Sequence, residues 1–285
     1  MILVKKILVQ IIDFLVYSNL FISIAAFVFT LQTALVFDSA LPASIFFAWT
    51  NFVATFILYN FQRIYESTKE PKSERMLWYD RNKKILFTLM LVFASLYFNF
   101  FKDHYDKFIE GLIAYVPISI LSIAYFMPPF NLRKLPVLKI FIIGFVWLFS
   151  SSVIPLMYED HTFVCLKNIG SKELEYIIAQ FLFISALCIP FDIKDLENDR
   201  QSSVRTLPVH FGISKAKKIG VVLFLLYIIL ANDGAQFIAY LIPGLLGAIL
   251  TMYSHDKKHR HYFYVLIDGL IILQFVLFFF LVQRG

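Results

Sequence analysis

Long stretches of apolar residues follow one another along this chain, with short polar segments between them. A helix that spans a bilayer needs about 20 predominantly apolar residues. Nine stretches approach or reach that length, and they cover residues 7–30, 41–62, 85–101, 109–127, 136–157, 175–192, 217–231, 234–253 and 262–282. Because only helices and closed barrels satisfy their backbone polar groups within lipid, the pattern predicts an all-α membrane protein with nine transmembrane helices.

The composition agrees with a membrane protein. Charged residues make up 16% of the sequence, whereas a typical soluble domain has about 25%. No soluble segment interrupts the spans, so residues 1–285 are expected to form a single transmembrane domain. Two long polar segments, 63–84 and 193–216, each follow an even-numbered span and lie four spans apart. This spacing predicts two four-helix halves followed by a ninth helix, as in membrane proteins built from repeats.

Lysine and arginine are distributed unequally between the two ends of the predicted spans. Of the 26 basic residues, 21 lie in or beside the N-terminal segment and the segments after the second, fourth, sixth and eighth spans. Since basic residues mark the cytoplasmic side, we expect a cytoplasmic N-terminus and an outside C-terminus. Topology thereby explains the net charge of +6, which does not predict a nucleic-acid partner. Cys165 and Cys188 fit neither a disulfide framework nor a zinc site.

Three carboxylates stand close together after the sixth span, in the segment CIPFDIKDLENDRQSSVRTLPVHFG that covers residues 188–212. On a helix, Asp192, Asp195 and Asp199 would fall within an arc of about 60°. Their mutual repulsion requires a cation, and Mg²⁺ is commonly held by one or two carboxylates together with a substrate phosphate. Candidates for the remaining phosphate oxygens are Lys194, Arg200 and Arg205. The pattern indicates a Mg²⁺–diphosphate site, although a solvated loop with charges of both signs has the same spacing.

The order of these residues resembles the second aspartate-rich motif of the UbiA-type intramembrane prenyltransferases, which is D-x-x-D-x-x-x-D-R followed by R-T-L-P-V and a glycine. In this sequence the glycine is Gly212. The stretch AYFMPPFNLRKLPVLKIFIIGFVW, residues 124–147, is similar to the family's segment after the fourth span. The resemblance covers essentially the whole chain.

The resemblance implies a fold of nine helices around a central cavity that opens toward the lipid, in the cell inner membrane. It also implies transfer of an isoprenyl group from a prenyl diphosphate to an acceptor. Asp192 and Asp195 would be the catalytic carboxylates and, with Asp199, the ligands of the cofactor Mg²⁺. Metal and basic side chains would neutralise the departing pyrophosphate, and a dry apolar cavity would exclude water.

The family's first motif, N-x-x-x-D-x-x-x-D after the second span, is not preserved. A frame that begins at Asn60 places Ile64 and Thr68 at the two aspartate positions. Two residues later the same spacing recurs with longer side chains, within about 80° on a helix. Its members are Gln62, Glu66 and Glu70. They form a candidate second metal site, with Asn60 and Gln62 as polar contacts, although glutamates at this spacing are ordinary on a solvated helix end.

Further polar residues have two interpretations each. Asp13 and Asp268 lie inside predicted spans, where an unpaired charge costs several kcal/mol, so each is either a cavity contact or half of a structural pair. Arg133 and Lys134 contribute to the positive cytoplasmic side and are also candidate diphosphate contacts. The turn SHDKKHRH, residues 254–261, is more typical of a short basic connection than of a metal site.

Three functions are compatible with these patterns. The leading hypothesis is a Mg²⁺-dependent prenyltransferase that works within the lipid bilayer on a prenyl diphosphate, with an acceptor that no motif specifies. A UbiA-type terpene cyclase would use the same donor without an acceptor. A non-catalytic isoprenoid-lipid binder or transporter would bind the donor without releasing pyrophosphate, and the altered first motif is the reason to consider it.

Overall fold

The computed structural model describes residues 2–37, 41–67, 74–102, 105–135, 137–159, 162–163, 170–202, 204–231 and 236–282. Its α-helices are α1 (Ile2–Tyr17), α2 (Leu20–Val36), α3 (Leu41–Ser67), α4 (Glu74–Phe101), α5 (Tyr105–Phe126), α6 (Leu138–Leu148), α7 (Ile154–Leu156), α8 (Ser171–Lys194), α9 (Leu196–Gln201), α10 (Leu207–Phe211), α11 (Ile213–Leu230), α12 (Phe237–Tyr253) and α13 (Asp268–Val282). The other elements are a 3₁₀ turn η2 (Leu132–Lys134), π-helical segments η3 (Phe149–Val153) and η6 (Tyr262–Ile267), and the antiparallel strands β1 (Tyr158–Glu159) and β2 (Thr162–Phe163). The predicted all-α class is confirmed.

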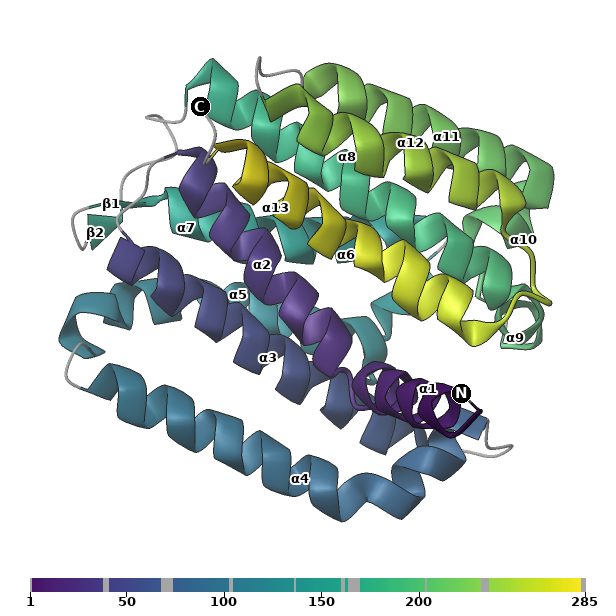
Figure 1. Ribbon diagram of the computed structural model, residues 1–285, viewed down its shortest axis with the longest axis horizontal. Helices are drawn as coiled ribbons and strands as arrows, with labels where there is room; N and C mark the ends of the chain where they lie inside the picture. The colour runs from purple at the N-terminus through teal and green to yellow at the C-terminus, as the bar shows by residue number, and fades with distance from the viewer. Residues whose placement is uncertain are drawn as a thin grey trace.

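The long helices lie side by side in one body (Figure 1). Helix α4 forms one edge, α11 and α12 form the opposite edge, and α8 and α13 lie between them. Along α4 eight large apolar side chains are exposed, including Phe87 at 56% and Leu96 at 60%. Such a surface is expected for a helix that faces lipid rather than water.

Each predicted span falls on a helix or on consecutive helices. Among the described residues, five helices are long and apolar enough to cross a bilayer, and the bent pair α1–α2 raises the number to six. Shorter apolar helices cover Gly111–Phe126 and Phe237–Tyr253. The chain is a multi-pass membrane protein. The total of nine crossings, the internal duplication and the placement of the termini stay predictions.

The first predicted span, 7–30, is not one straight helix. Helices α1 and α2 meet at Ser18 and Asn19 with a bend of 66°. Asn60 on α3 donates its amide to the Ser18 carbonyl at 3.0 Å. Asn19 donates to the Tyr79 hydroxyl on α4 at 3.0 Å and to Asn60 Oδ1 at 3.3 Å, and Tyr79 also donates to Asn60. This buried network fixes the bend against α3 and α4.

The main apolar core lies between α2, α6, α8, α11, α12 and α13, and it is rich in aromatic side chains. The ring of Phe183 on α8 stacks on that of Tyr227 on α11, with centroids 4.7 Å apart. Helices α11 and α12 approach closely at Gly247, where a Cβ atom would lie 2.4 Å from the ring of Phe224. Close packing on this side holds α8 firmly in the middle of the fold.

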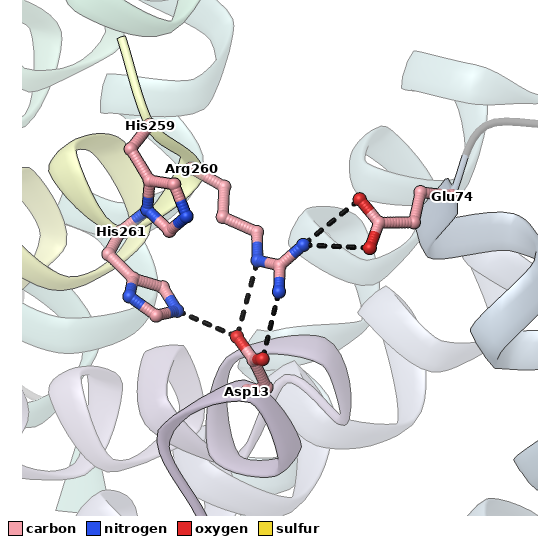
Figure 2. Close-up of polar contacts among 5 residues, drawn as sticks. All are labelled: Asp13, Glu74, His259, Arg260 and His261. Carbon is pink, nitrogen blue, oxygen red and sulfur yellow. Dashed lines mark hydrogen bonds and ion pairs between the residues drawn. The ribbon is translucent and has the colours of Figure 1, made fainter. Parts of the chain in front are cut away.

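A network of ion pairs joins α1, the start of α4 and the turn between α12 and η6 (Figure 2). Arg260 Nη2 is 2.8 Å from Asp13 Oδ2, and Arg260 Nη1 is 2.9 Å from Glu74 Oε1. His261 Nε2 is 2.7 Å from Asp13 Oδ1. Of the two interpretations of Asp13, the structure supports the structural pair.

We expect Arg260→Gln to destabilise the protein modestly. The substitution leaves Asp13 with His261 alone and releases Glu74, and because the network is partly exposed, the loss in the free energy of unfolding should be about 1 kcal/mol. Thermal unfolding in detergent would detect it as a small fall in Tm. Lys257→Gln, an exposed residue of the same turn, serves as the control, and an equal fall in that variant would contradict a role for the network.

Candidate functional site

A cavity of about 550 Å³ lies between α3, α6 and α8, and residues of α1, α2, α4, α5, η2, η3, η6 and α13 also line it. Its volume is in the range of small-molecule sites. Helix α3 lines it from Asn51 to Arg63, and α8 lines it from Ile184 to Lys194, with Asp195 directly after the helix. At about 1.5 Å per residue, the α3 stretch spans roughly 18 Å. The cavity is therefore long and runs parallel to these two helices.

The two ends of this cavity differ in charge. The charged side chains of its wall gather where α3 and α8 end and where α4, α6 and α13 begin. The basic ones are Arg63, Arg75, Arg133, Lys139 and Lys194, and the acidic ones are Asp192, Asp195 and Asp268. The middle is apolar and includes Ile143, Val146 and Leu187. An excess of two positive charges favours an anionic group at one end, and the apolar middle favours a hydrocarbon.

A buried ammonium joins two of the three predicted carboxylates. Lys139, in the first turn of α6, has its Nζ 2.7 Å from Asp192 Oδ1 and 3.5 Å from Asp199 Oδ2. The exposed fraction of the side chain is 12% for Lys139, 1% for Asp192 and 4% for Asp199. Burial raises the pKa of Asp199 above its usual value, and the Lys139 ammonium opposes that shift. One cation thus stands between two carboxylates, and Asp192 Oδ2 has no hydrogen-bond partner among the described residues.

The sequence predicts that Asp192, Asp195 and Asp199 share one helix face, and this prediction is wrong because α8 ends at Lys194, one residue before Asp195. Asp195 has φ −91° and ψ 8° and separates α8 from α9. Its Oδ1 is 3.4 Å from Lys194 Nζ, which donates to the Tyr264 hydroxyl at 2.7 Å. The break leaves Asp192 and Asp195 on the cavity wall, whereas Asp199 is not part of it.

The run R-T-L-P-V-H-F-G shapes the backbone around these carboxylates. The Arg205 carbonyl accepts a hydrogen bond from the Val137 amide at 2.9 Å, which holds the start of α6, and hence Lys139, against this segment. Pro208 lies in the first turn of α10, and Gly212 ends that helix with φ +82°, a conformation that favours glycine. The recognisable motif therefore positions the site without lining the cavity.

Two arginines stand on the side of the cavity where the first motif was expected. Arg63 belongs to α3, and Arg75 to the first turn of α4. Arg75 Nη2 donates to Asn19 Oδ1 at 2.7 Å and to the Val16 carbonyl at 3.1 Å. The Cζ atom of Arg75 is 4.9 Å from the centroid of the Tyr264 ring. This side of the wall thus offers basic groups to a ligand.

The residues predicted for a second metal site have different positions. Gln62 lines the cavity. Asn60 is fully buried and does not line the cavity, because its amide is used in the network that holds the α1–α2 bend. Glu70 and the side chain of Glu66 lie outside the described residues, so a metal site of Gln62, Glu66 and Glu70 stays a prediction.

The predicted diphosphate contacts divide into two groups. Lys194 and Arg133 line the cavity, and Asp268 lines it too, in keeping with the cavity interpretation of that residue. The exposed residues, which are not part of the wall, are Lys134, Arg200 and Arg205. Because the chain turns at Asp195, α9 directs Arg200 to the surface, where its Nη1 is 3.9 Å from Glu197.

The opposite end of the cavity contains a small polar cluster. Asn51 Nδ2 donates to Thr30 Oγ1 at 2.9 Å, to the Tyr115 hydroxyl at 3.1 Å and to the Ser150 carbonyl at 2.8 Å. Ser150 belongs to η3, a π-helical segment, and such segments are frequent at functional sites. The cavity therefore ends at a group of polar side chains, which lies near the middle of the helices that enclose it.

The sequence interpretation missed three cations of the wall. Lys139 had a usable signal, because it is a charged residue inside a predicted apolar span, and such residues are candidates for a functional site. Arg63 and Arg75 lie in a segment crowded with lysine and arginine. Nothing in that pattern distinguishes the two that turn inward.

The carboxylates of the wall limit how a metal ion could be held. Among the described residues, no three His, Cys, Asp or Glu side chains are placed to hold a metal ion, so the predicted trio does not converge. Asp192 and Asp195 remain, and Asp192 Oδ2 is buried without a hydrogen-bond partner in this part of the chain. Mg²⁺ is commonly bound by one or two carboxylates together with a substrate phosphate. The residues therefore fit one Mg²⁺ that arrives with a phosphorylated ligand.

No protein-family profile and no curated protein sequence matches this chain. Solved structures do match it. A UbiA homolog from Archaeoglobus fulgidus bound to GPP and Mg²⁺ aligns with a TM-score of 0.55 and 14% sequence identity, over 94% of this chain and 99% of that chain. Another structure of a UbiA homolog from that organism aligns with a TM-score of 0.56 and 12% identity, over 95% and 99%. The chain therefore has the helical membrane fold of the UbiA homologs.

Proposed function

We propose that this protein is an intramembrane prenyltransferase, which transfers an isoprenyl group from a prenyl diphosphate to an acceptor within the bilayer. The observation that carries the proposal is the cavity with one charged end and a long apolar middle. A prenyl diphosphate has the same two parts, an anionic head and a hydrocarbon tail. A solved structure of the same fold contains GPP and Mg²⁺, which supports this choice of ligand.

The basic residues of the wall would hold the diphosphate. Lys194, Arg133, Arg63 and Arg75 line the charged end, and Tyr264 fixes the Lys194 ammonium by a hydrogen bond of 2.7 Å. Negative charge develops on the pyrophosphate as the bond to the prenyl carbon breaks. Cations that are already oriented toward this charge lower the barrier without further rearrangement.

Asp192 and Asp195 would hold Mg²⁺ at the charged end. Bound there with the diphosphate, Mg²⁺ would supply positive charge against the leaving group. Asp199 has a different role, because it is not on the wall. We therefore assign Asp192 and Asp195, and not Asp199, to the metal.

The apolar middle of the cavity would hold the tail and protect the reacting carbon. When the carbon–oxygen bond breaks, the electron pair leaves with pyrophosphate, and the allylic carbon must meet the acceptor before it meets water. Apolar walls exclude that water, and the rings of Tyr59 and Tyr125 on the wall can stabilise positive charge. The acceptor then forms the new bond and loses a proton.

The charged end is proposed to face the cytoplasm of a cell with an inner membrane. It lies among the segments that carry most of the lysine and arginine, which are retained on the cytoplasmic side. A water-soluble acceptor or product would reach the site from that side. Protease protection of tags placed at the two termini would test this orientation.

Turnover by the purified full-length protein tests the proposed function. In lipid nanodiscs with Mg²⁺ and GPP, we expect release of pyrophosphate and, with a suitable acceptor, a prenylated product identified by mass spectrometry. Release of pyrophosphate together with a cyclic hydrocarbon or alcohol, without an acceptor, would identify a terpene cyclase instead. Saturable binding of GPP without any pyrophosphate release, over a broad panel of acceptors, would contradict an enzymatic role and favour a lipid binder.

A further inference from the structure

Lys139 is a charged residue in an otherwise apolar stretch, V-L-K-I-F-I-I. Its side chain has an exposed fraction of only 12%. A buried ammonium without partners is costly, and Lys139 is held by two carboxylates, Asp192 and Asp199. A cation in this place needs a specific explanation, because a buried ion pair generally adds little net stability.

A backbone contact just before α6 fixes the position of Lys139. Val137, two residues earlier, has φ +62°, a left-handed conformation that is unusual for a β-branched residue. Its amide donates to the Arg205 carbonyl at 2.9 Å. Backbone conformations of this kind persist where surrounding contacts impose them, and they concentrate at functional sites.

The positions of the oxygens explain what the ammonium does. It contacts Asp192 Oδ1 and Asp199 Oδ2, so one oxygen of each carboxylate faces a permanent positive charge. Without Lys139 these two buried carboxylates would face each other, and a divalent cation would be the natural group to join them. With Lys139 present, the members of the trio that remain on the wall for a metal ion are Asp192, through Oδ2, and the more exposed Asp195.

We infer that Lys139 is a built-in cation that occupies the position of a metal ion between Asp192 and Asp199, and thereby makes Mg²⁺ binding depend on the diphosphate. The inference deepens the proposed function and rests on it for the identity of the ligand. The Asp192–Asp195 side of the cavity then needs one metal ion, which enters with the diphosphate because two carboxylate oxygens alone hold it weakly. Lys139 is a positioning residue in this scheme, since it acts through Asp192.

Metal binding without any substrate tests this inference. We would titrate the full-length protein in nanodiscs with Mn²⁺, a paramagnetic substitute for Mg²⁺, and measure free Mn²⁺ by electron paramagnetic resonance. The wild type should bind Mn²⁺ weakly when no diphosphate is present. Lys139→Met, which keeps the length of the side chain but removes its charge, should bind Mn²⁺ more than about tenfold tighter, because a unit charge a few ångströms away no longer repels the ion.

Three variants separate this effect from others. Lys139→Arg keeps the charge and should bind Mn²⁺ as weakly as the wild type. Lys139→Met combined with Asp199→Asn should lose the gain, because the pair of carboxylates is gone. Lys218→Met, on an exposed part of α11, should change nothing. In addition, the Tm of Lys139→Met should be low in EDTA and recover with Mg²⁺, whereas the Tm of the wild type should not respond.

Two results would overturn the inference. The first is equal Mn²⁺ affinity in the wild type and in folded Lys139→Met. The second is tight, stoichiometric Mn²⁺ binding by the wild type without diphosphate. This result would overturn the inference even if Lys139→Met does not fold. Neither result depends on turnover, so this inference and the proposed function can fail separately.

Discussion

Asp192→Asn is expected to reduce pyrophosphate release from GPP by about 10²- to 10³-fold, the loss that follows removal of one well-placed electrostatic contact to a reacting group. The substitution keeps the shape of the side chain and removes its charge. It weakens the hold on the metal ion that accompanies the diphosphate, and it leaves Lys139 with Asp199 as a partner at 3.5 Å. The rate of pyrophosphate release by Asp192→Asn should therefore fall, whereas the variant should still fold.

Steady-state kinetics with Mg²⁺ and GPP, together with thermal unfolding of the same preparation, would check this expectation. Glu197→Gln is the matched control, because Glu197 is an exposed carboxylate on the adjacent helix α9 and does not line the cavity. Its rate should equal that of the wild type. An Asp192→Asn enzyme with unchanged turnover would remove Asp192 from the proposed mechanism.

Asn60→Leu is expected to cause the largest loss of stability among single substitutions at the predicted motifs. Asn60 Nδ2 donates to the carbonyls of Ser18 and Phe56, and its Oδ1 accepts from Asn19 and Tyr79. Leucine makes none of these bonds, and each buried group left without a partner costs about 1–3 kcal/mol. We expect the free energy of unfolding to fall by about 2–4 kcal/mol, together with a looser α1–α2 bend.

Asn99→Leu provides the comparison for this experiment. Asn99 lies on an exposed part of α4, and among the described residues it bonds only to Ser95 of its own helix. Unfolding in a mild detergent should show a clear fall in Tm for Asn60→Leu and almost none for Asn99→Leu. If both variants unfolded at the wild-type temperature, the buried network would not be what fixes the bend.

The class of fold could be predicted from the sequence because lipid leaves the chain few options. A stretch such as 175–192 is long and apolar, and it falls on α8 as expected. The bend at Asn19 could not be predicted, because apolar residues continue through it and the cause is a contact with Asn60, 41 residues away. Hydropathy reports burial in lipid, whereas helix direction depends on such long-range bonds.

The candidate site was predictable in part, for a related reason. Asp192 and Asp195 were found from their spacing, and both line the cavity. Extending one helix through Asp199 was wrong in detail, since the chain turns at Asp195 and carries Arg200 to the surface. Lys139 lies 53 positions before Asp192 in the chain. A local sequence pattern does not predict a contact between two separate helices.

The location of the ligand itself tests the central claim most directly. A structure of the full-length protein with Mg²⁺ and a non-hydrolysable thio analogue of GPP would locate both halves of the donor. Our account predicts that the diphosphate contacts Lys194 and Arg75, with the metal ion on Asp192 and Asp195 and the tail extended along α3 toward Asn51. A diphosphate bound at the exposed Arg200 and Arg205, or a tail that lies outside the cavity against α4, would contradict it.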